Sequence, residues 1–247
     1  MGKTTLIDWT NIPGYIGGTW NPWQGCTKVS AGCKNCYMFR DKRRYGKDPS
    51  TVARSAPATF QLPAKTKERH AWFVCSWSDF LHSAADEWRD EAISVMETNP
   101  HHIYLILTKR PERAGLIKWH WGRWPEHVWF GVTAENQEMY NERLPYLLDI
   151  PAKVRFLSVE PMLGRVNLSE PTVRNYSKDR IAWVICGGES GPSARPMNLD
   201  WARDLRDRCI SAGVPFFFKQ VGGTKRIDGH WGGNLLDGVL YQEFPSE

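Results

Sequence analysis

The feature that most limits the fold of this chain is a regular alternation of short apolar runs with segments of helical periodicity. The runs are apolar at consecutive positions, which indicates strands that are buried on both faces. The expected strands lie at residues 72–76, 103–107, 128–132, 154–159, 182–186 and 215–219. Strands of this kind, alternating with amphipathic helices, predict an α/β protein whose parallel sheet is covered by helices.

The helices expected between these strands complete the pattern. They lie at residues 37–45, 86–98, 112–120, 137–149 and 200–212, with Asp86 as a possible N-cap. A weakly marked first strand at residues 17–20 brings the number of strands to about seven. Because no glycine-rich dinucleotide turn joins a strand to a helix, we expect a partial or complete (β/α) barrel rather than a doubly wound sheet. Two stretches are less regular. Prolines make residues 47–67 an irregular connection, and a short turn or helix is expected at 163–168.

The length of 247 residues suits one barrel, so a single domain is expected over residues 1–247. Its glycine-rich extension, residues 222–247, is expected to form loops or a small hairpin. Hydrophobic residues make up 41% of the chain and charged residues 24%, which is typical of a globular protein. Neither a signal sequence nor an apolar run of about 18 residues is found, so we expect a cytoplasmic protein without a membrane partner.

Three of the six cysteines, Cys26, Cys33 and Cys36, lie in one short loop, and Gly25 and Gly32 each precede one of them. Thiolates grouped in this way are typical ligands of zinc or of an iron–sulfur cluster. A structural zinc site uses four protein ligands, and the sequence offers one CxxC pair and no second one. Three cysteines would leave one iron of a 4Fe–4S cluster open to a small molecule. Cys75, Cys186 and Cys209 fall in apolar segments and are expected to be buried hydrophobic residues.

Several further motifs join the cysteine loop in a resemblance to a known family. They are TWNPWQGC at 19–26, LTKRP at 107–111, GVTAENQ at 131–137, SVEPMLG at 158–164 and GGESG at 187–191. With these motifs the chain resembles the phage and bacterial three-cysteine-motif proteins of unassigned function, which look like radical S-adenosylmethionine (SAM) enzymes. The resemblance implies a barrel of the radical-SAM type, a 4Fe–4S cluster on the three cysteines, and SAM as cofactor. The chain departs from the usual CxxxCxxC pattern, because its first spacing is six residues and Asn35 stands where an aromatic residue is usual.

Polar residues follow the expected strands at the points where the apolar runs end, which in a barrel is the reactive face. By the resemblance, Ser76, Ser78 and Asp79 would lie near the methionine end of SAM. The residues expected near its ribose or near the substrate are Glu135, Asn136, Ser158 and Glu160. Lys219 ends another apolar run and is a further expected cofactor contact. The alternative for the carboxylates, including Glu189, is that they cap helices or pair with Arg110, Arg155 or Arg195.

The function that these features favour is a radical SAM-type enzyme that generates a 5′-deoxyadenosyl radical. It would need an external electron donor and a small-molecule or nucleic-acid substrate. Tyr37, Tyr104 and Cys75 are possible hydrogen donors, with no order among them. The occurrence of such proteins in phages suggests nucleobase or DNA modification, from the resemblance alone.

Two other functions stay open at this stage. The first is a zinc-containing nucleic-acid-binding module, in which His82 would complete the metal site and the basic segment 40–47 would meet phosphate. For that segment a solvated helix face is the simpler reading. The second is a metal-independent hydrolase that uses paired carboxylates such as Glu135 and Glu160. It leaves the cysteine loop unexplained.

Overall fold

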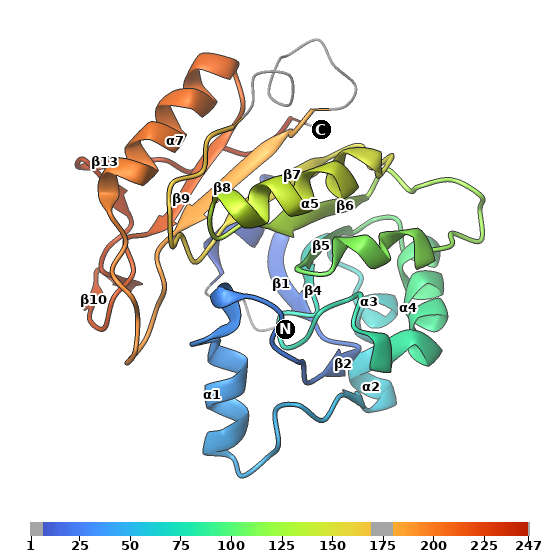
Figure 1. The fold of residues 1–247 in the computed structure, drawn as a ribbon. Helices are drawn as coiled ribbons and strands as arrows, with labels where there is room; N and C mark the ends of the chain where they lie inside the picture. The colour runs from blue at the N-terminus through green and yellow to red at the C-terminus, as the bar shows by residue number, and fades with distance from the viewer. Residues whose placement is uncertain (1–6, 169–179, 247) are drawn as a thin grey trace. The chain divides into compact units, whose positions relative to one another are not determined.

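The computed structural model describes residues 7–168 and 180–246 of the chain (Figure 1). Residues 1–6, 169–179 and 247 of the expected single domain lie outside the described residues. The chain packs as two compact units. Unit 1 contains residues 1–29, 36–131 and 150–153, and unit 2 contains residues 30–35, 132–149 and 154–247.

Seven strands form one sheet in the order β1-β4-β5-β6-β7-β8-β9. Their bounds are β1 Ile16–Trp20, β4 His70–Val74, β5 Ile103–Thr108, β6 Val128–Thr133, β7 Arg155–Val159, β8 Trp183–Gly187 and β9 Phe216–Gln220. Strand β1 pairs in parallel with β4, β4 with β5, β7 with β8, and β8 with β9. Every residue of β6, β7 and β8 is buried, as expected for a sheet that is covered on both faces. The seven-stranded α/β sheet is therefore confirmed, and its strand order has two ends, as in a partial rather than a closed barrel.

Unit 1 contains strands β1, β4 and β5 together with several helices. These are η1 Asp8–Thr10, α1 Tyr37–Arg44, α2 Pro57–Phe60, α3 Leu62–Lys65, η3 Ser83–Ala85, α4 Asp86–Thr98 and η4 Pro111–Leu116. Strands β2 (Trp23–Gln24) and β3 (Ala53–Arg54) also belong to this unit and form a two-stranded antiparallel sheet. Tryptophans fill much of the core, and two of them use their N–H groups to bind backbone carbonyls: Trp20 donates to Phe60 O at 3.0 Å and Trp23 to Asp79 O at 3.2 Å.

Helix α4 has the bounds expected from the sequence, because its apolar face of Ala92, Ile93 and Met96 is buried. Asp86 is its first residue rather than its N-cap, and its carboxylate accepts hydrogen bonds from Arg89 and Arg113. The acidic side chain still lies at the favourable end of the helix dipole.

Two expectations about unit 1 are wrong. The connection 47–67 contains β3, α2 and α3, because Pro57 and Pro63 stand in the first turns of the two helices, where a missing N–H costs nothing. The helix expected at 112–120 is the short 3-10 helix η4, which ends at Leu116 directly after Gly115. A glycine at that position weakens the continuation of a helix.

Unit 2 carries β7, β8 and β9 with helices α5 (Gln137–Asp149) and α7 (Leu199–Ala212). Asn198 caps the start of α7, where its side chain accepts a hydrogen bond from Asp200 N, and Gly213 caps the end with φ of +64°. The expected turn or helix at 163–168 contains no helix. The glycine-rich extension forms two small antiparallel pairs, β10 (Arg226–Ile227) with β11 (His230–Trp231) and β12 (Leu235–Leu236) with β13 (Val239–Leu240).

Within the described residues, none of the helices combines the length and the apolar character that crossing a bilayer requires.

Candidate functional site

Gly25 fixes the backbone at the start of the cysteine loop. Its φ is +103°, and a Cβ added there would lie 2.1 Å from the carbonyl oxygen of Thr51. Its N–H donates to Trp77 O at 2.9 Å, and its carbonyl accepts from the Ser78 hydroxyl at 2.5 Å. Cys26 N then donates to Pro49 O at 2.9 Å. The backbone that enters the loop is therefore held at consecutive residues.

We expect Gly25→Ala to lower the free energy of unfolding by about 3 kcal/mol, because backbone strain and a backbone clash add to each other. Gly46→Ala is the matched control: Gly46 also has a positive φ, +65°, but an added Cβ would meet nothing within 4 Å. Its cost should be the strain alone, about 1 kcal/mol. Urea denaturation followed by circular dichroism measures both, and equal losses in the two variants would contradict the steric argument.

Arg110 lies beside Cys26 in unit 1. Its Nη1 is 3.5 Å from Cys26 Sγ and 3.1 Å from Asp79 Oδ2, while Nη2 donates to Thr27 O at 2.8 Å and Oγ1 at 2.9 Å. The side chain is buried. Burial alone would lower the pKa of Arg110, but Asp79 and Cys26 together raise it. A buried guanidinium next to a sulfur is an environment that stabilises an anionic thiolate ligand.

Asp79 organises the segment after β4. Its carboxylate accepts hydrogen bonds from Leu81 N (2.9 Å), Thr108 Oγ1 (2.7 Å), Lys109 N (3.0 Å) and Arg110 (3.1 Å). The pairing with Arg110 that was expected as the alternative is therefore present. With four protein donors on its two oxygens, Asp79 positions the ends of β4 and β5.

Ser76 and Ser78 are also engaged with their neighbours. Ser76 Oγ accepts from Asn21 Nδ2 at 3.0 Å, and the Ser76 carbonyl accepts a hydrogen bond from the Tyr37 hydroxyl. Ser78 donates to Gly25 O, as described above. The sharp bend that brings these residues together is made by Cys75, a non-glycine residue with φ of +60°. Strained residues of this kind concentrate at functional sites.

Unit 2 holds the middle of the cysteine loop, residues 30–35, through Glu135. This residue is fully buried, and its Oε1 accepts from Gly32 N at 3.0 Å while Oε2 accepts from Arg143 Nη1 at 3.0 Å. Burial would raise the pKa of Glu135, but the Ser30 hydroxyl, the charge of Arg143 and the Gly32 N–H bring it below its ordinary value. Glu135 is thus an ionised residue that fixes the backbone directly before Cys33.

A second network in unit 2 holds the same part of the loop. Asn35 Nδ2 donates to Glu189 Oε2 at 2.8 Å and to Ser193 O at 2.7 Å. Arg195 pairs with Glu189 Oε1 at 2.6 Å and donates to Ala31 O at 3.0 Å. Sequence reasoning anticipated the pair of Glu189 and Arg195 but missed their contact with the loop. The available signal was Asn35, an amide side chain between two cysteines of the loop.

The remaining expected residues of unit 2 lie at the ends of β7 and β9 and at the start of α5. Asn136 Oδ1 accepts from Met139 N at 2.9 Å, next to the first turn of α5, and Ser158 is buried within β7. Glu160 and Lys219 form an ion pair of 2.5 Å whose side chains are about one fifth exposed. Of the expected contacts in this unit, this pair retains the most access to a ligand.

All six cysteines are present as thiols. Cys75, Cys186 and Cys209 are buried, as expected, and burial raises the pKa of each of them. Cys26, Cys33 and Cys36 are half-buried. No group of three or more His, Cys, Asp or Glu side chains positioned to hold a metal ion was found in the part of the chain that the structure describes. Three half-buried loop thiols are nevertheless a donor set that suits iron–sulfur ligation.

The comparisons with known proteins gave a match to one family. No match to the chain was found among curated proteins or among solved structures. The family described as "Protein of unknown function (DUF5131)" matches residues 4–245, and this agrees with the unassigned function of the family expected from the sequence. Because the match covers nearly the whole chain, the protein belongs to this family of unknown function.

Proposed function

We propose that the protein is a radical SAM-type enzyme whose 4Fe–4S cluster is ligated by Cys26, Cys33 and Cys36. The observation that carries the proposal is the support of the cysteine loop by buried charges. Arg110 contacts Cys26 and Thr27, Glu135 accepts the N–H of Gly32, and Glu189 accepts from Asn35. Ligands that are held by hydrogen bonds from outside the first coordination sphere are typical of metal sites.

When bound, such a cluster would supply the one-electron reduction of SAM that yields methionine and a 5′-deoxyadenosyl radical, with the electron coming from an external reductant. The chain's own residues would do the positioning. Arg110 would offset the negative charge of the thiolates, and Glu135 and Glu189 would hold the loop backbone. Glu160 and Lys219, as an accessible pair of opposite charges, are proposed to contact SAM or the substrate.

The zinc module receives less support. The ring nitrogen Nδ1 of His82 accepts a hydrogen bond from Ala84 N at 3.2 Å, so Nε2 carries the proton, 3.1 Å from Thr27 Oγ1. Neither nitrogen then offers a lone pair to a metal. The hydrolase also receives less support, because Glu135 is ionised, buried and paired with Arg143 rather than available as an acid or base.

Anaerobic reconstitution with iron and sulfide tests the proposal. We expect iron and sulfide in the proportion of one 4Fe–4S cluster per chain, with the broad visible absorption of such a cluster. The variants Cys26→Ala, Cys33→Ala and Cys36→Ala should each lose most of both, while Cys209→Ala, which changes a buried thiol of α7, should retain them.

The reaction itself is tested by adding dithionite and SAM to the reconstituted protein and measuring 5′-deoxyadenosine by mass spectrometry. The native protein and Cys209→Ala should form it, and the three loop variants should not. Stoichiometric zinc without iron after anaerobic purification, or cluster content that is unchanged in the loop variants, would rule the proposal out. Nucleobase or DNA as the substrate stays a prediction from the resemblance.

A further inference from the structure

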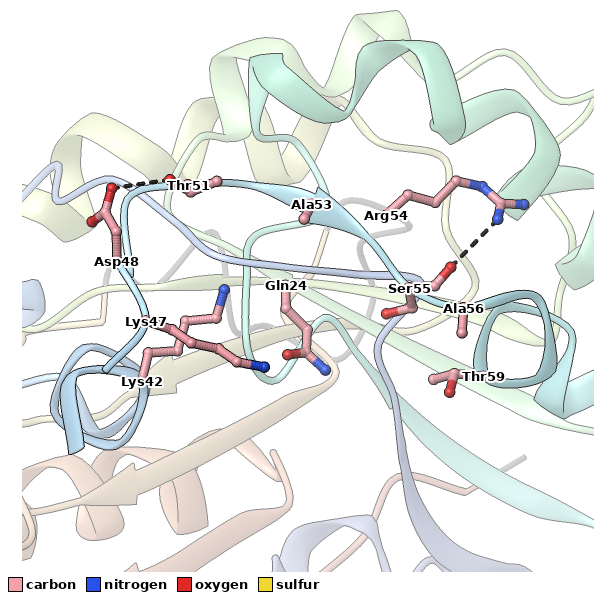
Figure 2. Close-up of a pocket in the computed structure, with 10 residues that line it drawn as sticks. All are labelled: Gln24, Lys42, Lys47, Asp48, Thr51, Ala53, Arg54, Ser55, Ala56 and Thr59. Atoms are coloured by element: carbon pink, nitrogen blue, oxygen red, sulfur yellow. Dashed lines mark hydrogen bonds between the residues drawn. The ribbon is translucent and has the colours of Figure 1, made fainter. Parts of the chain in front are cut away.

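Unit 1 contains a cavity of about 470 Å³ that no part of the proposed function uses (Figure 2). It lies between α1, the following loop and the segment from β3 into α2. Eight of its ten lining residues have polar side chains. The lining residues are Gln24, Lys42, Lys47, Asp48, Thr51, Ala53, Arg54, Ser55, Ala56 and Thr59.

Lys42 is the unusual residue of this cavity. Its side chain is only 7% exposed, although a lysine is rarely buried without a partner. Within the described residues, no hydrogen bond or ion pair to the Lys42 ammonium is present. Figure 2 shows Lys42, Lys47 and Gln24 directed into the same space. Burial, and then the neighbouring charge of Lys47, lower the pKa of Lys42, and the negative charge of Asp48 offsets part of this shift.

The other charged groups of the cavity are already engaged. Asp48 accepts from Ser50 N at 2.9 Å, from Ser50 Oγ at 2.7 Å and from Thr51 Oγ1 at 3.0 Å. Arg54 binds both carboxylate oxygens of Glu91 at 2.7 Å, and its guanidinium lies 4.1 Å from the ring centroid of Phe60. Serine and threonine are neutral, so Asp48 keeps its negative charge; Lys42 and Lys47 together outweigh it and leave a net positive charge in the cavity.

We propose that this cavity binds a phosphate group carried by a nucleotide or a polynucleotide. Two ammonium groups match a dianion with several acceptor oxygens, and lysine is a common point-charge ligand of phosphate. The Gln24 amide and the Thr59 hydroxyl are further donors in the lining. The volume exceeds that of one phosphate, so it leaves room for part of the attached nucleoside. This proposal does not depend on the proposed function, since the cavity lining contains none of the three loop cysteines.

The test is calorimetric titration of the full chain with three probes: inorganic pyrophosphate, adenosine 5′-monophosphate and a short single-stranded oligonucleotide. Lys42→Met keeps the length of the side chain and removes its charge. Its dissociation constant for the bound probe should rise at least about tenfold, the effect of losing one hydrogen bond from a charged donor. Arg44→Gln is the matched control, because Arg44 is an exposed residue of α1 that does not line the cavity. It should change binding of pyrophosphate or the mononucleotide by less than about twofold.

Each outcome of the titration has a meaning. Binding of pyrophosphate or the mononucleotide that depends on Lys42 supports a nucleotide ligand. Binding of the oligonucleotide alone, again dependent on Lys42, supports a polynucleotide backbone. If no probe binds, or if Lys42→Met and Arg44→Gln weaken binding equally, the proposal is wrong.

A stability measurement separates binding from folding. Because Lys42→Met removes a buried charge that has no hydrogen bond or ion pair in the described part of the chain, its thermal midpoint should equal or exceed that of the native chain. The bound probe should raise the midpoint of the native chain and not that of the variant. If Lys42→Met fails to fold, Lys47→Gln provides the second test, since Lys47 is exposed and its loss should weaken binding without affecting the fold. Unchanged binding by Lys47→Gln would then overturn the proposal.

Discussion

Glu135→Leu is expected to lower the free energy of unfolding by about 3–5 kcal/mol at neutral pH. The variant leaves the guanidinium of Arg143, which is 2% exposed, without its only carboxylate partner described in the structure. An unpaired buried charge costs this much because its lost hydration is no longer offset. The Gly32 N–H would lose its acceptor as well. Urea denaturation measures the change, and faster amide hydrogen exchange at Gly32 would report the release of the cysteine loop.

Two variants serve as controls for this prediction. Glu138→Leu, at an exposed position in the first turn of α5, should change stability by no more than about 0.5 kcal/mol. The double variant Glu135→Leu/Arg143→Met removes both charges and should recover a large part of the loss. A Glu135→Leu variant within 1 kcal/mol of the native chain would contradict the role given to this pair.

The pKa of Glu135 adds a pH dependence with a defined sign. Since the pKa is lower in the folded chain, the pair contributes its full stability above the ordinary pKa of 4.5. The contribution is lost as the pH falls through the lower, folded value. Acid should therefore lower the free energy of unfolding progressively as the pH falls below 4.5.

Acidification should also destabilise unit 1 through His102, by about 3 kcal/mol between pH 7 and pH 4. Burial lowers the pKa of His102 from 6.5 to about 4. Its Nδ1 accepts from His70 N at 3.2 Å, and Nε2 donates to Pro63 O at 3.0 Å. A second proton on the ring would occupy Nδ1, which could then no longer accept the hydrogen bond from His70 N. Between the two pKa values the unfolded chain binds more protons, so stability falls as the pH decreases from 6.5 towards 4.

The measurement is the free energy of unfolding as a function of pH for the native chain and two variants. His102→Gln should be less stable at pH 7 but should lose about 3 kcal/mol less on acidification. His101→Gln is the comparison: His101 is exposed and bonds Thr66 O, while its ring lies 3.9 Å from that of His102 and its charge is a smaller cause of the lowered pKa. It should keep most of the native pH dependence. Equal slopes for the native chain and His102→Gln would refute the assignment.

The fold was predictable where one periodicity dominates a segment. Helices α4 and α5 have the expected bounds, and the strands fall within one or two residues of the expected ranges. The prediction failed at residues 47–67, where prolines mark the beginnings of helices α2 and α3. A proline can mark an irregular connection or the first turn of a helix. The neighbouring sequence does not distinguish the two cases, because the difference depends on packing, here of Phe60 against Trp20.

The site was predictable in its residue types more than in its contacts. The residues after the strands were identified, and the pairs Asp79–Arg110 and Glu189–Arg195 were among the expected alternatives. The contacts of Glu135 and Asn35 with the cysteine loop join residues far apart in the sequence, and no local pattern encodes them.

For residues 40–47 the sequence favoured a solvated helix face over contact with phosphate, and the burial of Lys42 was missed. The signal was present in the helical spacing: Lys42 lies four residues after Met38 and three after Phe39, and all three side chains are buried. A lysine on the apolar face of a short basic helix indicates a buried cation.

The order of the strands in the sheet has a consequence for how the chain folds. Each strand after β4 in the seven-stranded sheet is added beside the one that precedes it in the sequence, so these pairings close short chain segments. The pairing of β1 with β4 is the exception, because it encloses residues 21–69, including Cys26, Cys33 and Cys36. Closing this long segment carries the largest entropic cost along the sheet. The cysteine loop is thus tethered at both ends as soon as the first two strands associate, and binding of the proposed cluster would come after the costliest loss of chain entropy.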